Sequence, residues 1–339
     1  MRQFSRFKMA AFGTVFMPQM ALSRFDGSQW SQAETVSSDS ISMHPGAHVL
    51  HYSSTCFEGL KAFKQPDGSI KLFRMDKNIA RFAQSSELLS LPAIDQQATA
   101  KMITDIVANF ADEVPAPPGS MYIRPTHFGI DPAIGKAAAP SLTSLQYVLL
   151  SPVGEYFNSD AGGLRLLLDE TGMRCAPHNG MIKSGGNYAS ALRPIMQARD
   201  KFKADQVLFC PGGFAQETGA ANFLLIDDNE IITKALDESF LHGVTRDSIL
   251  TLARDMGMTI SEREISIEEM LERSQKPGCE AALSGTAAVL APVGTFIHND
   301  KEYVLGDGKE GPVTSKLRQA MNDIQWGLAE DKHNWLFSV

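Results

Sequence analysis

Several features are scarce in this 339-residue chain, and each scarcity excludes a class of protein. Only four cysteines occur, at Cys56, Cys175, Cys210 and Cys279, and no two of them have C-x-x-C spacing. This usage argues against a disulfide framework and is typical of reduced thiols in a cytosolic protein. None of the eight histidines lies in an H-E-x-x-H or similar pattern, so we predict no metal site.

Long apolar runs and an excess of positive charge are also missing. No stretch approaches the roughly 20 apolar residues that cross a bilayer. The segment from Met1 to Met20 lacks a convincing cleavage site, which argues against a secretory signal. A net charge of −8 argues against nucleic acid as the main partner, although one pocket can still bind phosphate. We therefore expect a cytoplasmic protein that binds neither membranes nor nucleic acid.

The length and the 43% hydrophobic content are sufficient for two ordinary domains. Apolar runs at Leu60 to Phe63 and Ile70 to Phe73 flank Pro66-Asp67-Gly68, which predicts a β-hairpin. Strand and helix patterns are mixed along the chain, without the regular alternation of a Rossmann protein. The fold class we predict is α+β: two mixed α/β domains whose sheets are rich in antiparallel strands.

Composition also suggests where the domains meet. Between Ser151 and Gly163 the pattern dissolves into Pro, Gly, Asn, Ser and Asp, which is typical of a linker. We predict a small N-terminal domain over 1–152, an interdomain loop over 153–163 and a large C-terminal domain over 164–339. Helices are expected after caps at Asp76 and Thr245, after a capping box from Ser266 to Glu269, and over 187–203 and 312–326.

Lys183 lies in the run Met181-Ile182-Lys183-Ser184-Gly185-Gly186-Asn187-Tyr188. A lysine that forms a Schiff base works in a tight pocket, and neighbouring glycines let the backbone approach closely. Burial would lower the pKa of the amine and make it a better nucleophile and base. The ordinary interpretation is a solvated surface lysine beside a glycine turn.

Glu217 begins a second run of small residues, Glu217-Thr218-Gly219-Ala220-Ala221-Asn222. Pyridoxal phosphate requires an acid that keeps its ring nitrogen protonated, because the ring then works as an electron sink. The simpler interpretation is a strand-end carboxylate that faces water. Together, Lys183 and Glu217 suggest a covalent aldehyde cofactor.

Two segments are candidates for binding the phosphate. Gly243-Val244-Thr245-Arg246-Asp247 leads into a helix, and a helix N-terminus attracts anions, although Thr245 could be only an N-cap. Ser284-Gly285-Thr286-Ala287-Ala288 follows an apolar strand and offers hydroxyl and amide donors. Arg81 could add a fixed charge or be one of many surface arginines. Aromatic segments around Tyr52, Phe57 and Tyr122 could form core or line an apolar pocket.

Taken in order, these segments resemble the branched-chain amino-acid aminotransferases, which are class-IV (fold type IV) pyridoxal-phosphate enzymes. The resemblance runs nearly end to end. It is carried by Phe12-Gly13, His51-Tyr52-Ser53, Phe57 to Phe63, Leu72-Phe73-Arg74, Tyr122-Ile123-Arg124-Pro125, Pro152-Val153-Gly154, Tyr156-Phe157, Lys183 with Gly185 to Tyr188, Glu217 with Asn222, Gly243 to Arg246, and Ser284 to Ala287.

The resemblance implies a role for each segment. Lys183 would hold pyridoxal 5'-phosphate as its Schiff-base lysine and shuttle the proton, with the cofactor at the domain interface. Glu217 would pair with the ring nitrogen and Tyr188 with the phenolic oxygen. The phosphate would be bound by Arg81, Val244, Thr245 and Thr286. The substrate carboxylate would be bound by Tyr122 and the turn of Thr286, Ala287 and Ala288, and the side-chain pocket shaped by Tyr52, Phe57, Tyr156 and Phe157.

The implied activity is reversible ping-pong transamination of L-leucine, L-isoleucine and L-valine with 2-oxoglutarate, in a homodimer. Small amino acids and 2-oxo acids would then be the partners. Two positions depart from the family pattern: His242 replaces a common proline, and His178-Asn179 replaces a common glycine pair. The second change bears on the flexibility of its loop and on side-chain selectivity.

Other activities on the same scaffold remain open from sequence alone. They are a D-amino-acid aminotransferase, an aminodeoxychorismate lyase and an amine transaminase of (R) preference. The Phe57-Glu58-Gly59 and Tyr122 to Pro125 segments favour the branched-chain interpretation. A non-catalytic cofactor-binding protein is a rival of a different class, and the presence of both Lys183 and Glu217 argues against it.

Overall fold

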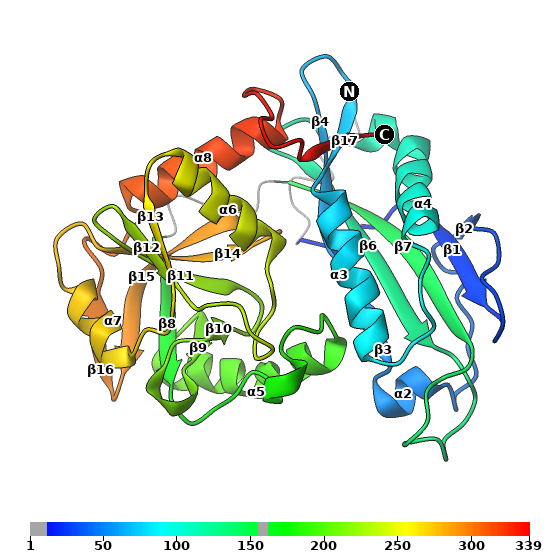
Figure 1. Cartoon of the computed structure of the whole chain (residues 1–339), viewed down its shortest axis with the longest axis horizontal. Helices are drawn as coiled ribbons and strands as arrows, with labels where there is room; N and C mark the ends of the chain where they lie inside the picture. Colours follow the sequence, from blue (N-terminus) through cyan, green and yellow to red (C-terminus); the bar gives the residue numbers. More distant parts are fainter. Residues whose placement is uncertain (1–11, 155–161) are drawn as a thin grey trace. The chain divides into compact units, whose positions relative to one another are not determined.

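The computed structural model describes residues 12–154 and 162–339, and it shows an α+β chain with two compact units (Figure 1). The first unit contains 12–154, 182–185 and 324–339, and the second contains 162–181 and 186–323. The segments 182–185 and 324–339 thus group with the first unit, whereas the sequence-based boundaries place them in the C-terminal domain. Two predicted site residues, Tyr156 and Phe157, lie outside the described residues.

The first unit is built on one antiparallel sheet with strand order β17-β5-β4-β6-β7-β1-β2, and β3 pairs with β6. Its strands are β1 (Gln19–Phe25), β2 (Glu34–Ser37), β3 (Thr55–Phe57), β4 (Leu60–Lys64), β5 (Ile70–Phe73), β6 (Ser120–Gly129), β7 (Ser144–Val153) and β17 (Leu336–Ser338). Its helices are α2 (His48–Tyr52), α3 (Met75–Leu88), α4 (Gln96–Asn109) and the 3₁₀ turn η1 (Ala111–Glu113).

The predicted hairpin is confirmed, because β4 and β5 pair directly across the Pro66-Asp67-Gly68 turn. Helices α3 and α4 bury Ile79 and Ile103 in one cluster with sheet residues such as Leu72. The predicted cap at Asp76 is wrong. The N-cap of α3 is Arg74 in a left-handed conformation (φ 52°), and Asp76 lies in the first turn, where its charge complements the helix dipole.

The last strand explains why the end of the chain belongs to the first unit. β17 pairs with β5, and the backbone N–H of Arg74 donates to the carbonyl of Trp335 at 2.8 Å. The Trp335 ring is buried against Phe73, and the Arg74 guanidinium lies 5.0 Å from the ring centroid. This long-range pairing leaves no local sequence signal at residues 336–338.

The second unit contains a nine-stranded mixed sheet with the order β10-β9-β8-β15-β14-β11-β12-β13, and β16 pairs with β15. β10 also pairs with β11, which closes part of this order into a ring. The strands are β8 (Leu164–Asp169), β9 (Gln206–Phe209), β10 (Glu217–Thr218), β11 (Asn222–Asp227), β12 (Glu230–Thr233), β13 (Thr259–Glu262), β14 (Glu280–Gly285), β15 (Val289–His298) and β16 (Lys301–Val304). The helices are α5 (Gly185–Phe202), α6 (Val244–Asp255), α7 (Ile267–Ser274), α8 (Pro312–Gln325) and the 3₁₀ turns η3 (Pro177–Asn179) and η4 (Pro211–Gly213).

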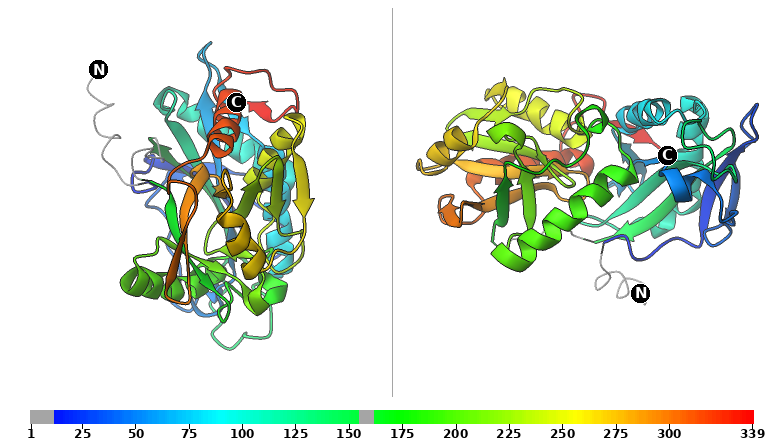
Figure 2. Two further views of the ribbon diagram at one scale, coloured as in Figure 1. Left: turned by 90° about the vertical axis from the view of Figure 1, so that its left-hand side faces the viewer. Right: turned by 90° about the horizontal axis from the view of Figure 1, so that it is seen from below.

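Alternate residues of the second sheet face two apolar clusters. Leu166 and Leu208 lie in a cluster with Met270 of α7, whereas Val207 lies in another with Ala198 of α5. Figure 2 shows α5 as one long helix at the outside of these strands. Successive residues of β8 and β9 point to opposite faces of the sheet. One face therefore packs against α7 and the other against α5.

Two predicted caps in the second unit have different outcomes. Ser266 caps α7, since its Oγ accepts from the Glu269 N–H at 3.1 Å. The Glu269 carboxylate binds Arg263 and Arg273. The cap at Thr245 is wrong, because Gly243 occupies the N-cap of α6 and no side chain caps this end.

Within the described residues, no helix is long and apolar enough to cross a membrane. The same portion of the chain contains no cluster of three or more His, Cys, Asp or Glu side chains that could hold a metal ion.

Candidate active site

Lys183 is fixed through its backbone to the first unit. Its N–H donates to Ser85 Oγ of α3 at 3.1 Å, and its carbonyl accepts from the N–H of Phe57 in β3 at 3.0 Å. The next residue, Ser184, forms an isolated bridge with Cys56. Lys183 Nζ lies 5.1 Å from the centroid of the Phe57 ring. The lysine is therefore held at both backbone atoms, and its amine lies against an aromatic face.

Phe57 and Tyr122 meet at a cation that the sequence did not single out. The Arg124 guanidinium lies 4.6 Å from the Phe57 ring centroid and donates from Nη2 to Tyr122 Oη at 2.8 Å. Tyr122 and Arg124 are two apart on β6 and so share one face. Gly59 permits the approach, because a Cβ there would lie 2.1 Å from Tyr122 Oη. The i, i+2 spacing was the available signal for Arg124.

Arg81 lies on α3 and is paired with a carboxylate. Its Nε and Nη2 donate to the two oxygens of Glu58 at 2.7 and 2.8 Å, and both side chains are buried. Arg81 and Ser85 are four residues apart on α3 and hence lie on one face of the helix. One helix face thus positions both the predicted phosphate ligand and the backbone of Lys183.

Tyr52 lies at the end of α2 and has different neighbours. Its hydroxyl donates to the carbonyl of Ile134, and its ring contacts His48 at 4.8 Å between centroids. These contacts tie Tyr52 to the 130–139 loop. They do not place it beside Phe57 and Tyr122, so its assignment to the side-chain pocket stays a prediction.

Glu217 is buried in the second unit, with only 1% of its surface exposed. Its Oε1 accepts from Arg174 Nη1 at 2.7 Å and from the N–H of Leu241 at 3.0 Å. Arg174 also lies 5.5 Å from the ring centroid of Tyr188, near the start of α5. The simpler expectation of a strand-end carboxylate in water is wrong, because β10 lies between β9 and β11. Sequence reasoning missed Arg174, whose partner is 43 residues away.

Asn222 connects Glu217 with the two predicted phosphate segments. Its Nδ2 donates to the Leu241 carbonyl at 2.8 Å and lies 3.5 Å from Glu217 Oε2. A Cβ on Gly243 would lie 2.0 Å from Asn222 Oδ1, so only glycine fits there. Asn222 is also the register partner of Ser284 in β14. The second unit thus brings together Glu217, the start of α6 and the end of β14.

The two phosphate segments have the backbone features that anion binding requires. Val244 and Thr245 form the first turn of α6, whose amides carry no side-chain cap. Amide dipoles at such an uncapped helix start favour an anion. Thr286, Ala287 and Ala288 form the tight turn between β14 and β15, followed by Val289 at φ 63°. A β-branched residue in this region is rare, and backbone strain of this kind often marks a functional turn.

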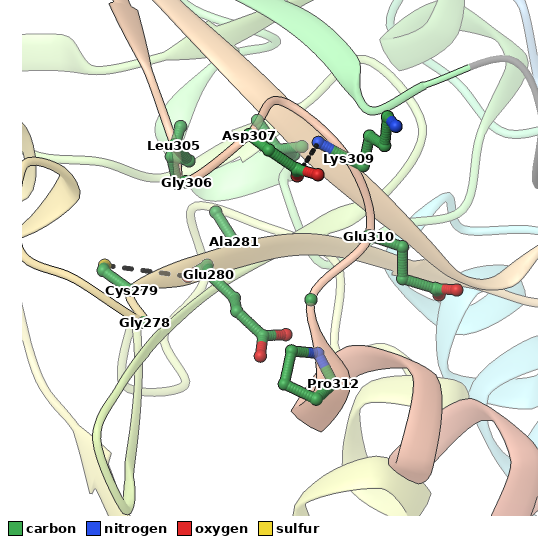
Figure 3. Close-up of a pocket in the computed structure, with 12 residues that line it drawn as sticks. Gly278, Cys279, Glu280, Ala281, Leu305, Gly306, Asp307, Lys309, Glu310 and Pro312 are labelled. Atoms are coloured by element: carbon green, nitrogen blue, oxygen red, sulfur yellow. Dashed lines mark hydrogen bonds between the residues drawn. The ribbon is translucent and has the colours of Figure 1, made fainter.

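A cavity of about 270 Å³ also lies in the second unit. Figure 3 shows Glu280 directed toward the start of α8, next to Pro312. The Glu280 oxygens accept from the backbone N–H groups of Val313 and Thr314 at 2.9 and 2.8 Å. This buried carboxylate is engaged in capping α8, and none of the predicted site residues lines the cavity.

Comparison with known proteins places these features in a family. The family model described as "Amino-transferase class IV" matches residues 55–295. A probable branched-chain-amino-acid aminotransferase of Streptomyces coelicolor is 36% identical, over 97% of this chain and 92% of that protein. A crystal structure of the Escherichia coli branched-chain amino acid aminotransferase matches with a TM-score of 0.77 and 25% identity, and covers 93% of this chain and 98% of that one.

A crystal structure of the branched-chain amino acid aminotransferase from Thermobaculum terrenum, in its PLP form, has the same fold. It matches with a TM-score of 0.75 and 19% identity, over 95% of this chain and 99% of that one. The family model and the sequence relative point to the same family, and the two aminotransferase structures share the fold of this chain. This chain belongs to the class IV aminotransferases, among the branched-chain amino-acid aminotransferases.

Proposed function

We propose that this protein transfers the amino group of L-leucine, L-isoleucine or L-valine to 2-oxoglutarate, reversibly, with pyridoxal 5'-phosphate as cofactor. The products are a branched-chain 2-oxo acid and L-glutamate. The observation that carries the proposal is the similarity to branched-chain aminotransferases over 97% of the chain. The settings of Lys183 and Glu217, described above, support it.

The side chains present fit the cofactor. Arg174 Nη2 and Ser284 Oγ are buried polar atoms without a hydrogen-bond partner in the described portion of the chain. Both belong to the segments joined around Asn222, where a polar group of a ligand would satisfy them. The uncapped first turn of α6 likewise suits a phosphate. Arg81, Val244, Thr245 and Thr286 would bind that phosphate, and Tyr188 the phenolic oxygen.

When bound, the cofactor carries the amino group between substrates and accepts the electron pair left at the substrate α-carbon. Lys183 would hold the cofactor covalently and, once displaced by the substrate amine, would move the α-proton with its Nζ. Glu217 would keep a proton on the ring nitrogen. Its burial beside Arg174 suits an acid that stays ionised.

The substrate contacts would come from both a polar and an apolar surface. Tyr122 and the turn of Thr286, Ala287 and Ala288 would bind the α-carboxylate. Phe57 would contact the branched side chain, with Tyr52, Tyr156 and Phe157 as further members of the pocket. An apolar pocket resolves one methylene by only about 1–3 kcal/mol, so activity should overlap among the three amino acids.

Glutamate needs a cation in the same pocket, and Arg124 has the right setting for it. Its guanidinium lies between Phe57 and Tyr122, and its Nε is buried with no hydrogen-bond partner among the described residues. We propose that Arg124 binds the side-chain carboxylate of glutamate and 2-oxoglutarate. A planar guanidinium suits both a carboxylate and an aromatic face, so it can serve polar and apolar substrates in turn.

A homodimer in the cytoplasm completes the proposal. The surface formed by α2 and the 130–142 loop exposes Leu50 (58%), Ile134 (68%) and Leu142 (58%). Large exposed apolar side chains in one region favour burial against a second copy. Sedimentation of the wild type and of Leu50→Glu tests this: a dimer that the variant weakens supports it, and a wild-type monomer contradicts it.

A substrate panel tests the activity. L- and D-amino acids are offered with 2-oxoglutarate, and glutamate formation is followed. We expect L-leucine, L-isoleucine and L-valine to be the best donors. A preference for D-amino acids would instead favour the D-amino-acid aminotransferase on this scaffold. Lys183→Ala should abolish both turnover and the visible absorbance band of the bound cofactor, whereas wild-type protein without that band would contradict the cofactor assignment.

A further inference from the structure

Arg174 is the largest side chain that is completely buried in the described part of the protein. Its Nη1 donates to Glu217 Oε1 at 2.7 Å and also lies 3.3 Å from the carbonyl of Gly180. Its guanidinium lies 5.5 Å from the Tyr188 ring centroid. One cation therefore touches both side chains proposed to contact the cofactor ring, and it ties down the loop that precedes Lys183 in sequence.

The charge of Arg174 matters because Glu217 is buried. A carboxylate moved from water into a protein interior tends to take up a proton, since burial penalises the charged form. An arginine stays protonated at all physiological pH values and so opposes this uptake. The Leu241 N–H on the same oxygen acts in the same direction. Removing Arg174 would take away the cation that bonds this carboxylate directly.

The guanidinium also fixes orientation. Glu217 lies on β10, which has only two residues, whereas Tyr188 lies on α5. Arg174 joins these elements, and its own carbonyl accepts from Ser190 Oγ of α5. A planar guanidinium can bind a carboxylate along its edge while its face lies on an aromatic ring. Lysine at this position could supply the charge but not both contacts.

We propose that Arg174 is a positioning residue for the cofactor. It keeps Glu217 ionised and holds the Tyr188 ring in place, so that Glu217 can retain the proton on the ring nitrogen. This inference rests on the proposed function, since Glu217 and Tyr188 must contact the cofactor. A purely structural role for Arg174 would affect stability and would leave the ionisation of the bound cofactor unchanged.

The experiment compares holoenzymes with Arg174→Lys, Arg174→Gln, Glu217→Gln and the double change Arg174→Gln/Glu217→Gln. Arg273→Gln is the matched control. Arg273 lies in the same unit and pairs with Asp227 at the same 2.7 Å, but it touches no proposed site residue. The readouts are the pH titration of the cofactor's visible absorbance, cofactor affinity, and kcat and KM for leucine.

We expect Arg174→Gln to lower kcat by about 100-fold, as removal of a preorganised charge often does. KM for leucine should change by less than about threefold, because the α-carboxylate contacts remain. The midpoint of the absorbance titration should move by about one pH unit. Arg174→Lys should have a kcat about tenfold higher than Arg174→Gln. Lysine restores the positive charge but lacks the planar guanidinium that contacts both the carboxylate and the ring. Arg273→Gln should leave the titration unchanged.

The double change gives the decisive comparison. If Arg174 acts through Glu217, adding Arg174→Gln to Glu217→Gln should cost less than about threefold in kcat. Independent, multiplying losses would overturn the inference, as would an absorbance titration that neither Arg174 variant moves. Arg174→Lys supplies the titration if Arg174→Gln does not fold. Wild-type enzyme that binds cofactor but forms no glutamate from leucine would sink the proposed function, while the titration still tests Arg174.

Discussion

At the residue scale, two buried charged residues of the candidate site are held by partners of opposite charge. Glu58 holds Arg81 by two hydrogen bonds, and Arg174 holds Glu217. A buried charge without a partner would be costly, and both Arg81 and Glu217 have a partner of opposite charge in their own unit. The partner also restricts the rotamers of the ligand. The site is therefore organised before any substrate arrives.

His127 is a buried titratable group that is held neutral. It is fully buried on β6, and its two ring nitrogens bond Ser86 Oγ and Ser144 Oγ at 3.0 and 2.9 Å. Burial lowers the pKa of His127 from 6.5 to about 3. In the unfolded chain the same imidazole takes up a proton near its ordinary pKa. The unfolded state therefore binds more protons between these two values, and stability must fall as the pH falls through that window.

We predict that this histidine alone lowers the free energy of unfolding by about 2 kcal/mol between pH 7.5 and pH 5. His127→Gln removes the titrating group, so its stability should fall less over the same interval, even if it is less stable at pH 7.5. Urea unfolding of both proteins at the two pH values measures this difference. An equal fall in both would show that His127 is not held neutral in the folded state.

At the element scale, local patterns placed the helices well but misplaced some of their ends. Asp76 and Thr245 have the side chains that favour N-caps, yet Arg74 and Gly243 occupy those positions. At the start of α6, Gly243 is required because Asn222 approaches it closely. A long-range contact thus displaced the local preference. The uncapped amides that result are what a phosphate site needs.

The first turn of α8 is capped by a side chain from β14, which is distant in sequence. Glu280 of β14 accepts from two backbone N–H groups in the first turn of this helix. We predict that Glu280→Ala lowers the free energy of unfolding by about 2 kcal/mol, because one buried and one partly buried amide lose a charged partner. Glu280→Gln should cost less, since it keeps one acceptor oxygen. Thermal or urea unfolding measures both.

A second variant examines the same cap from the helix side. A Cβ at Gly311 would lie 2.0 Å from the Glu280 carboxyl carbon. Gly311→Ala should therefore destabilise the wild type but be better tolerated in the Glu280→Ala background. Equal costs in the two backgrounds would mean that the Glu280 side chain is not what excludes a Cβ at Gly311.

At the scale of the whole molecule, the C-terminal segment 324–339 packs into the unit that the N-terminal half of the chain forms. The C-terminal strand β17 extends the sheet of the first unit, and Trp335 is buried there against Phe73. Because Trp335 and Phe73 both belong to the first unit, loss of this contact should act on the stability of that unit.

We predict that Trp335→Ala lowers the free energy of unfolding by about 3–5 kcal/mol, the usual cost of removing a large buried aromatic side chain. Leu328→Ala is the control, because Leu328 is 65% exposed and its truncation should stay within about 0.5 kcal/mol. Hydrogen exchange shows where the loss falls. Protection lost first in β5 supports the pairing with β17, whereas uniform loss would contradict it.

Features that depend on neighbours along the chain could be predicted from the sequence. The β4–β5 hairpin, the extent of α5 near 187–202 and the Ser266 cap follow from turn residues and periodicity. The order of the motifs also indicated the family. Lys183 was found because its glycine-rich surroundings are local.

Contacts between residues that are distant in sequence became visible only in the folded chain. Arg174 has no local feature that distinguishes it from a surface arginine, because its partner Glu217 lies 43 residues away on another strand. Arg124 shares one face of β6 with Tyr122, but its contact with Phe57 of β3 is long-range. The placement of β17 beside β5 and the cap of α8 by Glu280 arise in the same way. Such contacts form when distant strands pair and buried charges find partners. Both depend on residues far apart in sequence, so a short segment does not predict them.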